Sequence, residues 1–536
     1  MTFTFTVSPQ DWGRIAPVLV LVGMALVVMI VDILLPHEGA RTKHSGPQNF
    51  AVLPILSFLS ILGAIGATIW LFIVSDQQQA FNHMVGSDWG TLYGYLIILS
   101  ASGLGILLSP AYLKRLKLVH QGEYYALMLM ATVGMMLMAA ATSFVMIFLG
   151  IEMLSLALYV LCGFVARRKA SQEAGMKYFL LSSFASAFLL YGIAMTYGAT
   201  GQTSFNGVKQ AVDLLKAGHH SSTLLWIALG LLGVGFAFKV SAIPFQAWTP
   251  DVYQGAPAPV TAFMSVGTKA AAIIAFARVF DIVFQALYNT WEPIVWVIAI
   301  LTIIGGNIMA VGQSNAKRLL AYSSIAHAGY LLIGVVIGGR IGISAILFYL
   351  LCYTFMNLGA FPTLAGLLAF FLLALAGFPP MAGFAAKYYI FYAALQGGHV
   401  DLLIISVLAS VLGMYYYLRV IATMFMEQEA APAASLPTVP VPESRAVRRV
   451  PAKARVTGGL AAARSATAVA EKPSTAKLAK TAVPPATEVE PVVVGKLSWM
   501  TWLSLSLAVI GTLAMGTVLP FWLVGVAQRA AELMLR

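Results

Sequence analysis

Apolar segments of about 20 residues recur along the whole chain, and this repetition decides what the chain can fold into. Because a helix rises about 1.5 Å per residue, one such segment is long enough to cross the roughly 30 Å hydrocarbon core of a bilayer. The segments are continuous and do not alternate between polar and apolar residues, which excludes a transmembrane β-barrel. We therefore predict an all-α, polytopic membrane protein of about fourteen transmembrane helices, at residues 14–35, 50–75, 91–108, 124–141, 143–165, 176–198, 223–246, 257–281, 291–312, 317–338, 342–361, 363–395, 400–426 and 498–526.

The composition supports a membrane location. Hydrophobic residues make up 60% of the 536 residues and charged residues only 10%, whereas roughly a quarter of a soluble domain is charged. The lipid bilayer must therefore surround most of the chain. A net charge of +12 would point to nucleic acid in a soluble protein, but residues 430–496 alone hold ten Lys or Arg and four Glu. Half of the charge belongs to that one segment, so we expect no nucleic-acid partner.

Short basic loops indicate how the helices cross the membrane. Lys and Arg accumulate in cytoplasmic loops of membrane proteins, and four such loops all follow predicted helices that run in the same direction. These loops contain Arg41 and Lys43, Lys114, Arg115 and Lys117, Arg167, Arg168 and Lys169, and Lys317 and Arg318. Both ends of the chain are then expected to face outward, and the first apolar run is expected to be a retained helix and not a signal peptide.

Residues 428–496 differ in composition from the rest of the chain. They are rich in Ala, Pro and Val and carry no sustained apolar period. Prolines recur too often for a helix, so the pattern predicts a disordered linker. Its basic charge is compatible with anionic lipid headgroups, while the simpler interpretation is a solvated spacer.

Several ionisable side chains lie in the middle of apolar segments. A charged side chain at the centre of a bilayer costs about 2.5–3.5 kcal/mol on insertion scales, so each one requires a function or a partner. The residues in question are Glu152, Lys239, Lys269, His327 and Lys387. Ionisable groups in separate helices are typical of a path for protons.

Simpler interpretations remain open for these and related residues. Lys177, Arg278 and Arg419 stand near helix ends, where a long side chain can reach the interface. A lone His327 is also compatible with a hydrogen-bonded core residue. For Glu152, Lys239 and Lys269 the alternative is a buried structural ion pair, which packing alone does not require in so many helices.

Prolines interrupt two of the predicted helices beside these lysines. Pro244 follows Lys239 by five residues, and the pair Pro379 and Pro380 precedes Lys387. The interrupted helices, the seventh and the twelfth, are five helices apart and therefore run in opposite directions. Broken helices at matching places in two inverted halves indicate an ion path, and the freed backbone groups require water or polar partners.

Four segments carry a specific family resemblance. They are FKVSAIPFQAWTPDVYQGAPAPVTAFMSVGTKAA, NAKRLLAYSSIAHAGYLLIG, FYLLCYTFMNLGAF and ASVLGMYYYLRV. These segments resemble subunit N of bacterial respiratory complex I, the NADH–quinone oxidoreductase, which belongs to the antiporter-like proton-pumping subunits. The resemblance covers nearly all of residues 1–427 and the last helix.

The resemblance implies roles for individual residues. It implies that Glu152 pairs with Lys239, and that Lys177, Lys269, His327 and Lys387 complete a proton-translocating axis. It also implies two inverted five-helix repeats and these parts of the chain: helices 1–3 (1–123), a first repeat (124–287), a second repeat (291–427), the linker (428–496) and a last helix (497–536).

The resemblance also implies partners and a location. The partners would be other complex I membrane subunits, above all neighbouring antiporter-like subunits, and the location would be the bacterial cytoplasmic membrane. FMN, iron–sulfur clusters, NADH and quinone would bind to partner subunits, because this sequence carries no nucleotide-binding or cysteine-cluster motif. No cofactor or metal is expected in this chain.

The sequence departs from the family in one connection. Phe361, Pro362 and Thr363 join the predicted helices 342–361 and 363–395 directly, where the family has a polar loop. We still expect two separate helices there, because fusion would invert every later segment against the positive-inside preference.

Two other functions stay open at this point. One is a sodium/proton antiporter subunit, either independent or of the Mrp type, driven by ion gradients. The other is a purely structural membrane anchor. Loss of pumping after neutralisation of Lys239 would argue against the anchor.

Overall fold

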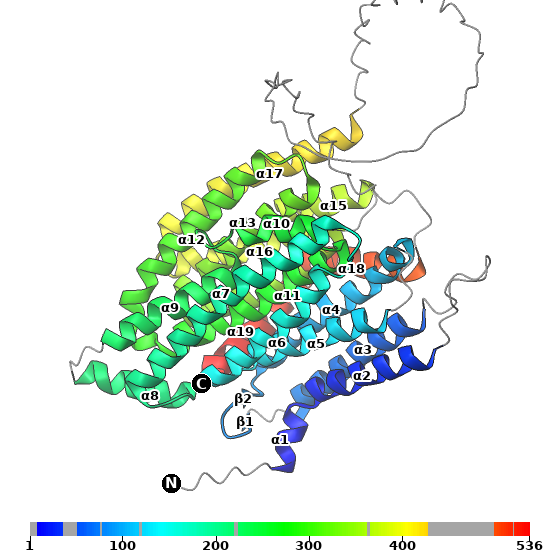
Figure 1. Cartoon of the computed structure of the whole chain (residues 1–536). Helices are drawn as coiled ribbons and strands as arrows, with labels where there is room; N and C mark the ends of the chain where they lie inside the picture. The colour runs from blue at the N-terminus through cyan, green and yellow to red at the C-terminus, as the bar shows by residue number, and fades with distance from the viewer. Residues whose placement is uncertain are drawn as a thin grey trace, which may run out of the picture. The chain divides into compact units, whose positions relative to one another are not determined.

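The structure is a computed structural model that describes residues 8–35, 51–74, 78–116, 121–218, 223–361, 365–426, 498–517 and 519–535. Within these residues it is almost entirely helical, and thirteen helices are long and apolar enough to cross a membrane (Figure 1). The predicted linker at 428–496 lies outside the described residues. The polytopic all-α fold is therefore confirmed.

The first part of the chain contains α1 (Pro9–Arg14), α2 (Ala16–Leu34), α3 (Val52–Val74), β1 (Gln79–Ala80), β2 (Val85–Gly86) and α4 (Trp89–Arg115). There follow α5 (Gly122–Ala139), α6 (Phe144–Cys162), α7 (Lys169–Thr200), α8 (Phe205–Ala217), α9 (Thr223–Val240), α10 (Trp248–Gly255), α11 (Ala258–Ala277), η1 (Arg278–Val283) and η2 (Gln285–Leu287). The last part contains α12 (Tyr288–Val311), α13 (Ala316–Ile337), α14 (Gly339–Ala360), α15 (Ala365–Ala376), α16 (Ala382–Gln396), α17 (Val400–Phe425), α18 (Trp499–Thr517) and α19 (Pro520–Leu535).

Both predicted helix breaks are present. In the seventh predicted span, 223–246, α9 ends at Val240 before Pro244, and α10 begins just beyond the span at Trp248. The twelfth span is divided into α15 and α16 around Pro379 and Pro380. Proline lacks the N–H that a helix interior needs, and its ring clashes with the preceding turn. Helix α14 ends at Ala360 and α15 is a separate helix, as predicted despite the short connection.

The predicted span at 498–526 is wrong in one respect. It is not one helix, because α18 ends at Thr517 and α19 begins at Pro520. Proline fits the first turn of a new helix but not the interior of a continuing one. Short elements were also missed by a search for long apolar runs, among them the β1–β2 hairpin, α8 and α10.

The helices that carry the central ionisable residues are the most buried ones. Every residue of α11 is buried, and α13 and α14 are almost as enclosed, whereas only about a third of α2, α7 and α17 is buried. A helix that is hydrophobic on all sides belongs in a core. The outer helices present apolar side chains such as Phe184 and Leu408 to their surroundings, as a lipid-facing surface requires.

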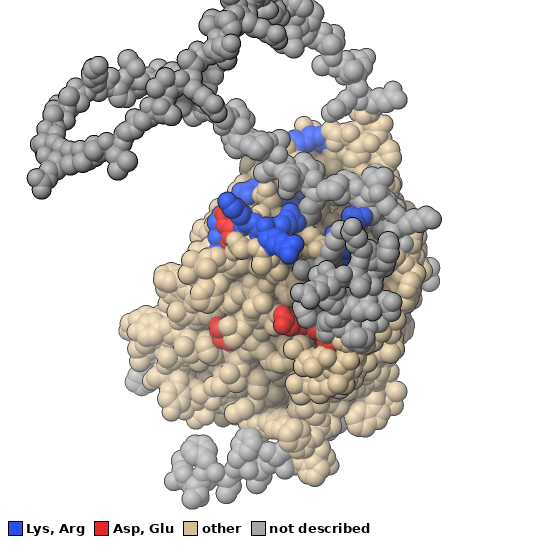
Figure 2. Space-filling model, turned by 45° about the vertical axis from the view of Figure 1, so that its right-hand side comes forward, with Lys and Arg blue, Asp and Glu red and all other residues tan. Residues whose placement is uncertain are grey.

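Basic residues gather at one end of the described helices. Figure 2 shows Lys and Arg concentrated in one region of the visible surface, while most of the face is uncharged. Contacts place the loops together: Arg168 donates to the Tyr112 hydroxyl, Lys317 to the Ala256 carbonyl and Arg318 to Asp251. These are loops that the sequence assigned to the cytoplasmic side.

A second set of polar contacts marks the opposite end. Arg278 forms an ion pair with Asp88 at 2.7 Å, and the side chain of Arg278 is only 4% exposed. Its guanidinium also donates to Thr91. Arg278 is therefore a buried link between η1 and α4. Its position near a helix end allowed its side chain to reach the membrane interface, but the structure shows that it does not.

Candidate functional site

The break after α9 places a lysine at the end of a half-helix. Lys239 lies in the last turn of α9 and is 3% exposed. The backbone leaves the helix at Ser241, which has a φ of 67°. The indole N–H of Trp248 donates to the Phe238 carbonyl at 3.0 Å, and the Ile243 N–H donates to Thr302. At this break, the backbone groups that leave the helix are therefore satisfied by hydrogen bonds to side chains.

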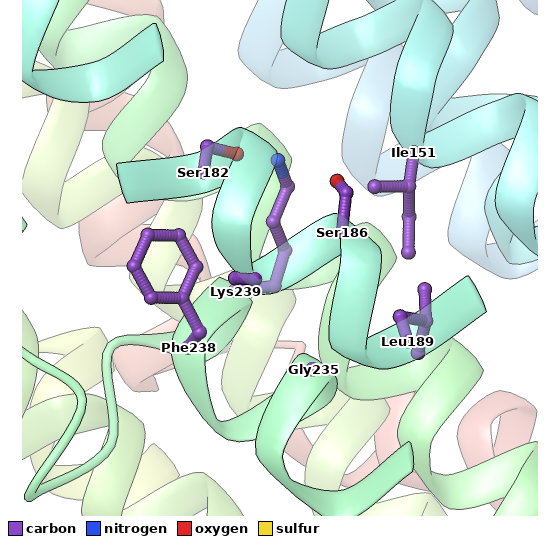
Figure 3. Close-up of a pocket in the computed structure, with 8 residues that line it drawn as sticks. Ile151, Ser182, Ser186, Leu189, Gly235, Phe238 and Lys239 are labelled. Carbon is purple, nitrogen blue, oxygen red and sulfur yellow. The ribbon is translucent and has the colours of Figure 1, made fainter. Parts of the chain in front are cut away.

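The ammonium of Lys239 is held by hydroxyl groups. Its Nζ donates to Ser155 Oγ at 2.6 Å and to the Tyr178 hydroxyl at 3.4 Å. Beside the Lys239 side chain is a cavity of about 10 Å³, and Ser182 and Ser186 are among the residues that line it (Figure 3). That volume is near the lower limit for one water molecule, and Ser182, Ser186 and Lys239 are the polar residues in an otherwise apolar lining.

Glu152 lies one helical turn before Ser155 on α6. Its Oε1 atom is buried and has no hydrogen-bond partner in the described part of the chain. The carboxylate and the Lys239 ammonium are close enough to interact electrostatically. The hydrogen bonds of Lys239 nevertheless go to Ser155 and Tyr178, so the structure brings the two residues together without a direct bond.

Lys177 occupies a more exposed position than the other lysines. Its side chain is 41% exposed and pairs with Glu173 at 2.7 Å and with Asp251 at 2.8 Å. Arg318 binds the other oxygen of Asp251 at 2.7 Å. This surface network joins α7, α10 and α13 and stands apart from the buried groups.

Lys269 is enclosed at the centre of α11. It is 1% exposed, and its Nζ donates to both the carbonyl oxygen and the hydroxyl of Ser324 on α13, the carbonyl at 2.6 Å. The Tyr353 hydroxyl donates to the same Ser324 hydroxyl at 2.9 Å. Lys269 is therefore the first member of a hydrogen-bonded chain from α11 through α13 to α14.

His327 lies on α13 one turn beyond Ser323 and is 2% exposed. Its Nδ1 atom is 2.7 Å from the Tyr349 hydroxyl, and its Nε2 atom is 3.4 Å from the Tyr417 hydroxyl. Both ring nitrogens thus face hydroxyl groups that can either donate or accept.

The second break places Lys387 next to the end of another half-helix. Lys387 lies on α16, and its Nζ donates to the carbonyl of Ala376, the last residue of α15, at 2.9 Å. It also donates to Ser410 at 2.9 Å and lies over the ring of Tyr330, 5.6 Å from its centroid. The freed carbonyl predicted at the proline pair is therefore occupied by the lysine itself.

The buried groups form two clusters. One surrounds Lys239. The other contains Lys269, His327 and Lys387, because His327 interacts electrostatically with both lysines and Tyr330 lies against both the His327 ring and the Lys387 ammonium. In the part of the chain that the structure describes, no ion pair within 4.0 Å is found for Lys239, Lys269 or Lys387. A buried structural ion pair therefore does not account for these lysines.

The sequence search for charged residues missed the hydroxyl partners. Ser155, Tyr178, Ser324 and Ser410 occupy apolar helices, where serine and tyrosine are too common to stand out. One signal was available, because Ser155 lies three residues after Glu152 and so shares its helix face. Across the described ranges, no group of three or more His, Cys, Asp or Glu could hold a metal ion.

Comparisons with known proteins agree on one family. Residues 141–364 and 360–413 match the family described as NADH:quinone oxidoreductase/Mrp antiporter, transmembrane. NADH-quinone oxidoreductase subunit N of Trichlorobacter lovleyi is 43% identical over 444 residues, which cover 77% of this chain and 87% of the relative.

Two solved structures share the fold. One is respiratory complex I from Thermus thermophilus with bound aureothin, in which the matching chain has 31% identity and a TM-score of 0.62, covering 77% of this chain and 90% of its own. The other is the Mrp complex from a Dietzia species, with a TM-score of 0.70 over 98% of this chain and 97% of its own. At 20% identity the Mrp match supports the fold alone.

Proposed function

We propose, from the premise that the chain belongs to the NADH-quinone oxidoreductase subunit N family, that protons cross it through Lys239, Lys269, His327 and Lys387. The chain is a membrane subunit of this proton-translocating complex, and its sequence carries no nucleotide-binding or cysteine-cluster motif for a redox centre. Electrons are transferred in other subunits, and that transfer drives proton movement here.

The observation that carries the proposal is the set of partners of the three buried lysines. Their ammonium groups donate to hydroxyls and carbonyls and not to carboxylates. A buried charge without a counter-ion is costly, while a neutral amine can remain bonded to the same hydroxyls. Each lysine can therefore gain and lose a proton while it keeps its hydrogen-bond partners.

Glu152 is proposed as the group that changes the charge state of Lys239. Its Oε1 atom lacks a partner, and only one helical turn separates Glu152 from Ser155, which holds the ammonium. A carboxylate that moves toward the lysine favours the protonated amine, and one that moves away favours release. Against a potential of 100 mV, one elementary charge needs about 2.3 kcal/mol, and redox-linked movement in the complex would provide it.

Lys177 is proposed as a part of the proton entrance at the basic end. We expect Lys177→Met to slow NADH-driven pumping by about two- to fivefold, because a half-exposed ion pair contributes at most about 1 kcal/mol. Pumping rates of the reconstituted complex measure this. Lys169→Met is the matched control, since Lys169 is an exposed lysine at the start of the same helix, and it should stay close to the wild-type rate. A complete loss with Lys177→Met would place this residue in the obligatory path instead.

Several finer assignments belong to the same proposal. The partners would be neighbouring antiporter-like subunits. FMN, iron–sulfur clusters, NADH and quinone would bind to other subunits of the complex. The complex would lie in the bacterial cytoplasmic membrane. The chain would be organised as the N-terminal helices (1–123), two inverted repeats (124–287 and 291–427), the linker (428–496) and the C-terminal segment (497–536).

Purification from native membranes tests this assignment. A tagged chain is expected to carry flavin and iron–sulfur absorbance, and NADH is expected to acidify the interior of vesicles that contain the purified complex. The Mrp-type alternative predicts the opposite pattern, namely no flavin and a proton movement that depends on a sodium gradient. Sodium-driven exchange by a flavin-free preparation would refute the complex I assignment.

A further inference from the structure

His327 is clamped between two tyrosines on different helices. Tyr349 of α14 lies at Nδ1 and Tyr417 of α17 lies at Nε2. A neutral imidazole has one N–H donor and one bare nitrogen, so one tyrosine must accept while the other donates. The two hydroxyls together therefore decide which nitrogen of His327 carries the proton.

The Tyr417 hydroxyl has a second partner that competes with the imidazole. It forms a short hydrogen bond with Ser323 Oγ, while its distance to His327 Nε2 is 3.4 Å. A hydroxyl has a single proton to donate. The structure therefore captures Tyr417 bonded closely to Ser323, with the imidazole at the long limit of a hydrogen bond.

Ser323 connects this pair to the neighbouring lysine. The next residue, Ser324, holds the Lys269 ammonium through its carbonyl and its hydroxyl. One turn of α13 thus carries Ser324, which binds the lysine, Ser323, which binds Tyr417, and His327. All of these side chains are buried, so bulk water is excluded from them.

We infer that the Tyr417 hydroxyl is a relay residue that carries protons between the Ser323 side and His327 by alternating between these two partners. This inference rests on the proposed function and extends it from the charged residues to a neutral one. Tyr417 lies in the segment GMYYYLRV, which the charged-residue axis leaves without a role.

The transfer conserves protons and charge at each relay atom. In one direction, Tyr417 gives its O–H proton to His327 Nε2 and takes the O–H proton of Ser323, while His327 releases its Nδ1 proton to Tyr349. Each hydroxyl oxygen and the imidazole lose one proton and gain one. On the Ser323 side, the Lys269 ammonium loses the proton that enters the relay. On the Tyr349 side, a neutral lysine gains the proton that leaves the relay. Water carries it where side chains are not in contact.

The test uses the intact complex in vesicles and compares two buried tyrosines. Tyr417→Phe removes one oxygen and keeps the ring, and we expect pumping to fall about tenfold, the effect of one lost buried hydrogen bond on a rate. Tyr124→Phe is the matched control. Tyr124 is as buried as Tyr417 and its hydroxyl also pairs with a serine, Ser109, at 2.9 Å, but it lies on α5 outside the relay, so pumping should stay within about twofold of the wild type.

Two further measurements separate a relay from a packing role. The ratio of pumping rates in H₂O and D₂O should rise in Tyr417→Phe and stay unchanged in Tyr124→Phe, because only a relay makes proton transfer limiting. Ser323→Ala should reproduce the loss, and the Ser323→Ala/Tyr417→Phe double variant should lose no more than either single variant.

Equal pumping and equal isotope ratios in the two phenylalanine variants would overturn the relay. Additive losses from Ser323→Ala and Tyr417→Phe would overturn it as well, because the two hydroxyls would then act independently. A complex that pumps without Lys239 would refute the proposed function itself, whereas a Lys239-dependent complex that is indifferent to Tyr417 would refute only the relay.

Discussion

NADH-driven pumping is expected to fall at least about 100-fold when Lys239 is replaced by Met, because the substitution removes a proton-transferring group. Methionine keeps most of the side-chain volume, so the complex should still assemble. The change removes the amine that lies between Ser155, Tyr178 and the break at Pro244. Pumping in vesicles and assembly on a native gel are the two measurements.

Lys239→Arg separates charge from proton exchange. A guanidinium keeps its proton at any physiological pH, so arginine should fail although it preserves the positive charge. Lys169→Met is the control, because Lys169 is an exposed lysine at the start of α7 and should leave pumping unchanged. Full pumping by assembled Lys239→Met complex would mean that protons follow another route.

Substitution of Gly383 by Ala is expected to destabilise the subunit by about 3 kcal/mol or more, since overpacking against a rigid neighbour has no easy relief. Gly383 lies in the first turn of α16, and a Cβ there would overlap the carbonyl oxygen of Ala374 in α15. That oxygen belongs to the backbone, so no side chain can turn aside. The expected result is loss of the assembled complex from the membrane, measured on a native gel.

Gly366→Ala is the matched control for the packing of the broken helix. Gly366 lies on α15, and a Cβ added there would meet nothing within 4 Å. Alanine also favours a helix by about 1 kcal/mol over glycine, so assembly should be unchanged or slightly improved. If Gly383→Ala assembles as well as Gly366→Ala, the two half-helices are not held as closely as the structure has them.

Sequence reasoning succeeded where a single residue dictates local structure. Pro244 and the pair Pro379 and Pro380 were predicted to interrupt membrane helices, and the structure has a break at each, whereas Pro110 lies inside the continuous helix α4. Lys239, Lys269 and Lys387 stand out because charge is rare in apolar helices. Their burial was therefore predictable, and the roles of all six ionisable residues remain predictions.

The partners of those residues could not be read from the sequence. Ser155 and Ser324 became relevant only when α6 packed beside α9 and α13 beside α11, because hydrogen bonds across helices depend on rotation and register. Tyr417 is one of three consecutive tyrosines, and no pattern in the sequence distinguishes it. The same limit applies to α8, whose buried residues Phe205 and Val212 lie in a segment too short and too polar to resemble a span.

The two broken helices have an electrical consequence. Peptide dipoles sum along a helix to about half a negative elementary charge at its C-terminal end. Lys239 occupies the last turn of α9, and Lys387 binds the carbonyl that ends α15. The Lys387 ammonium therefore faces a fixed partial anion that is built from the backbone and has no proton to exchange, and Lys239 lies in the helix turn where the same dipole acts. When a lysine releases its proton, no full negative charge is stranded in the membrane, because the dipole is present in both states. Half-helices thus let a buried amine change its charge without a counter-ion that must change with it.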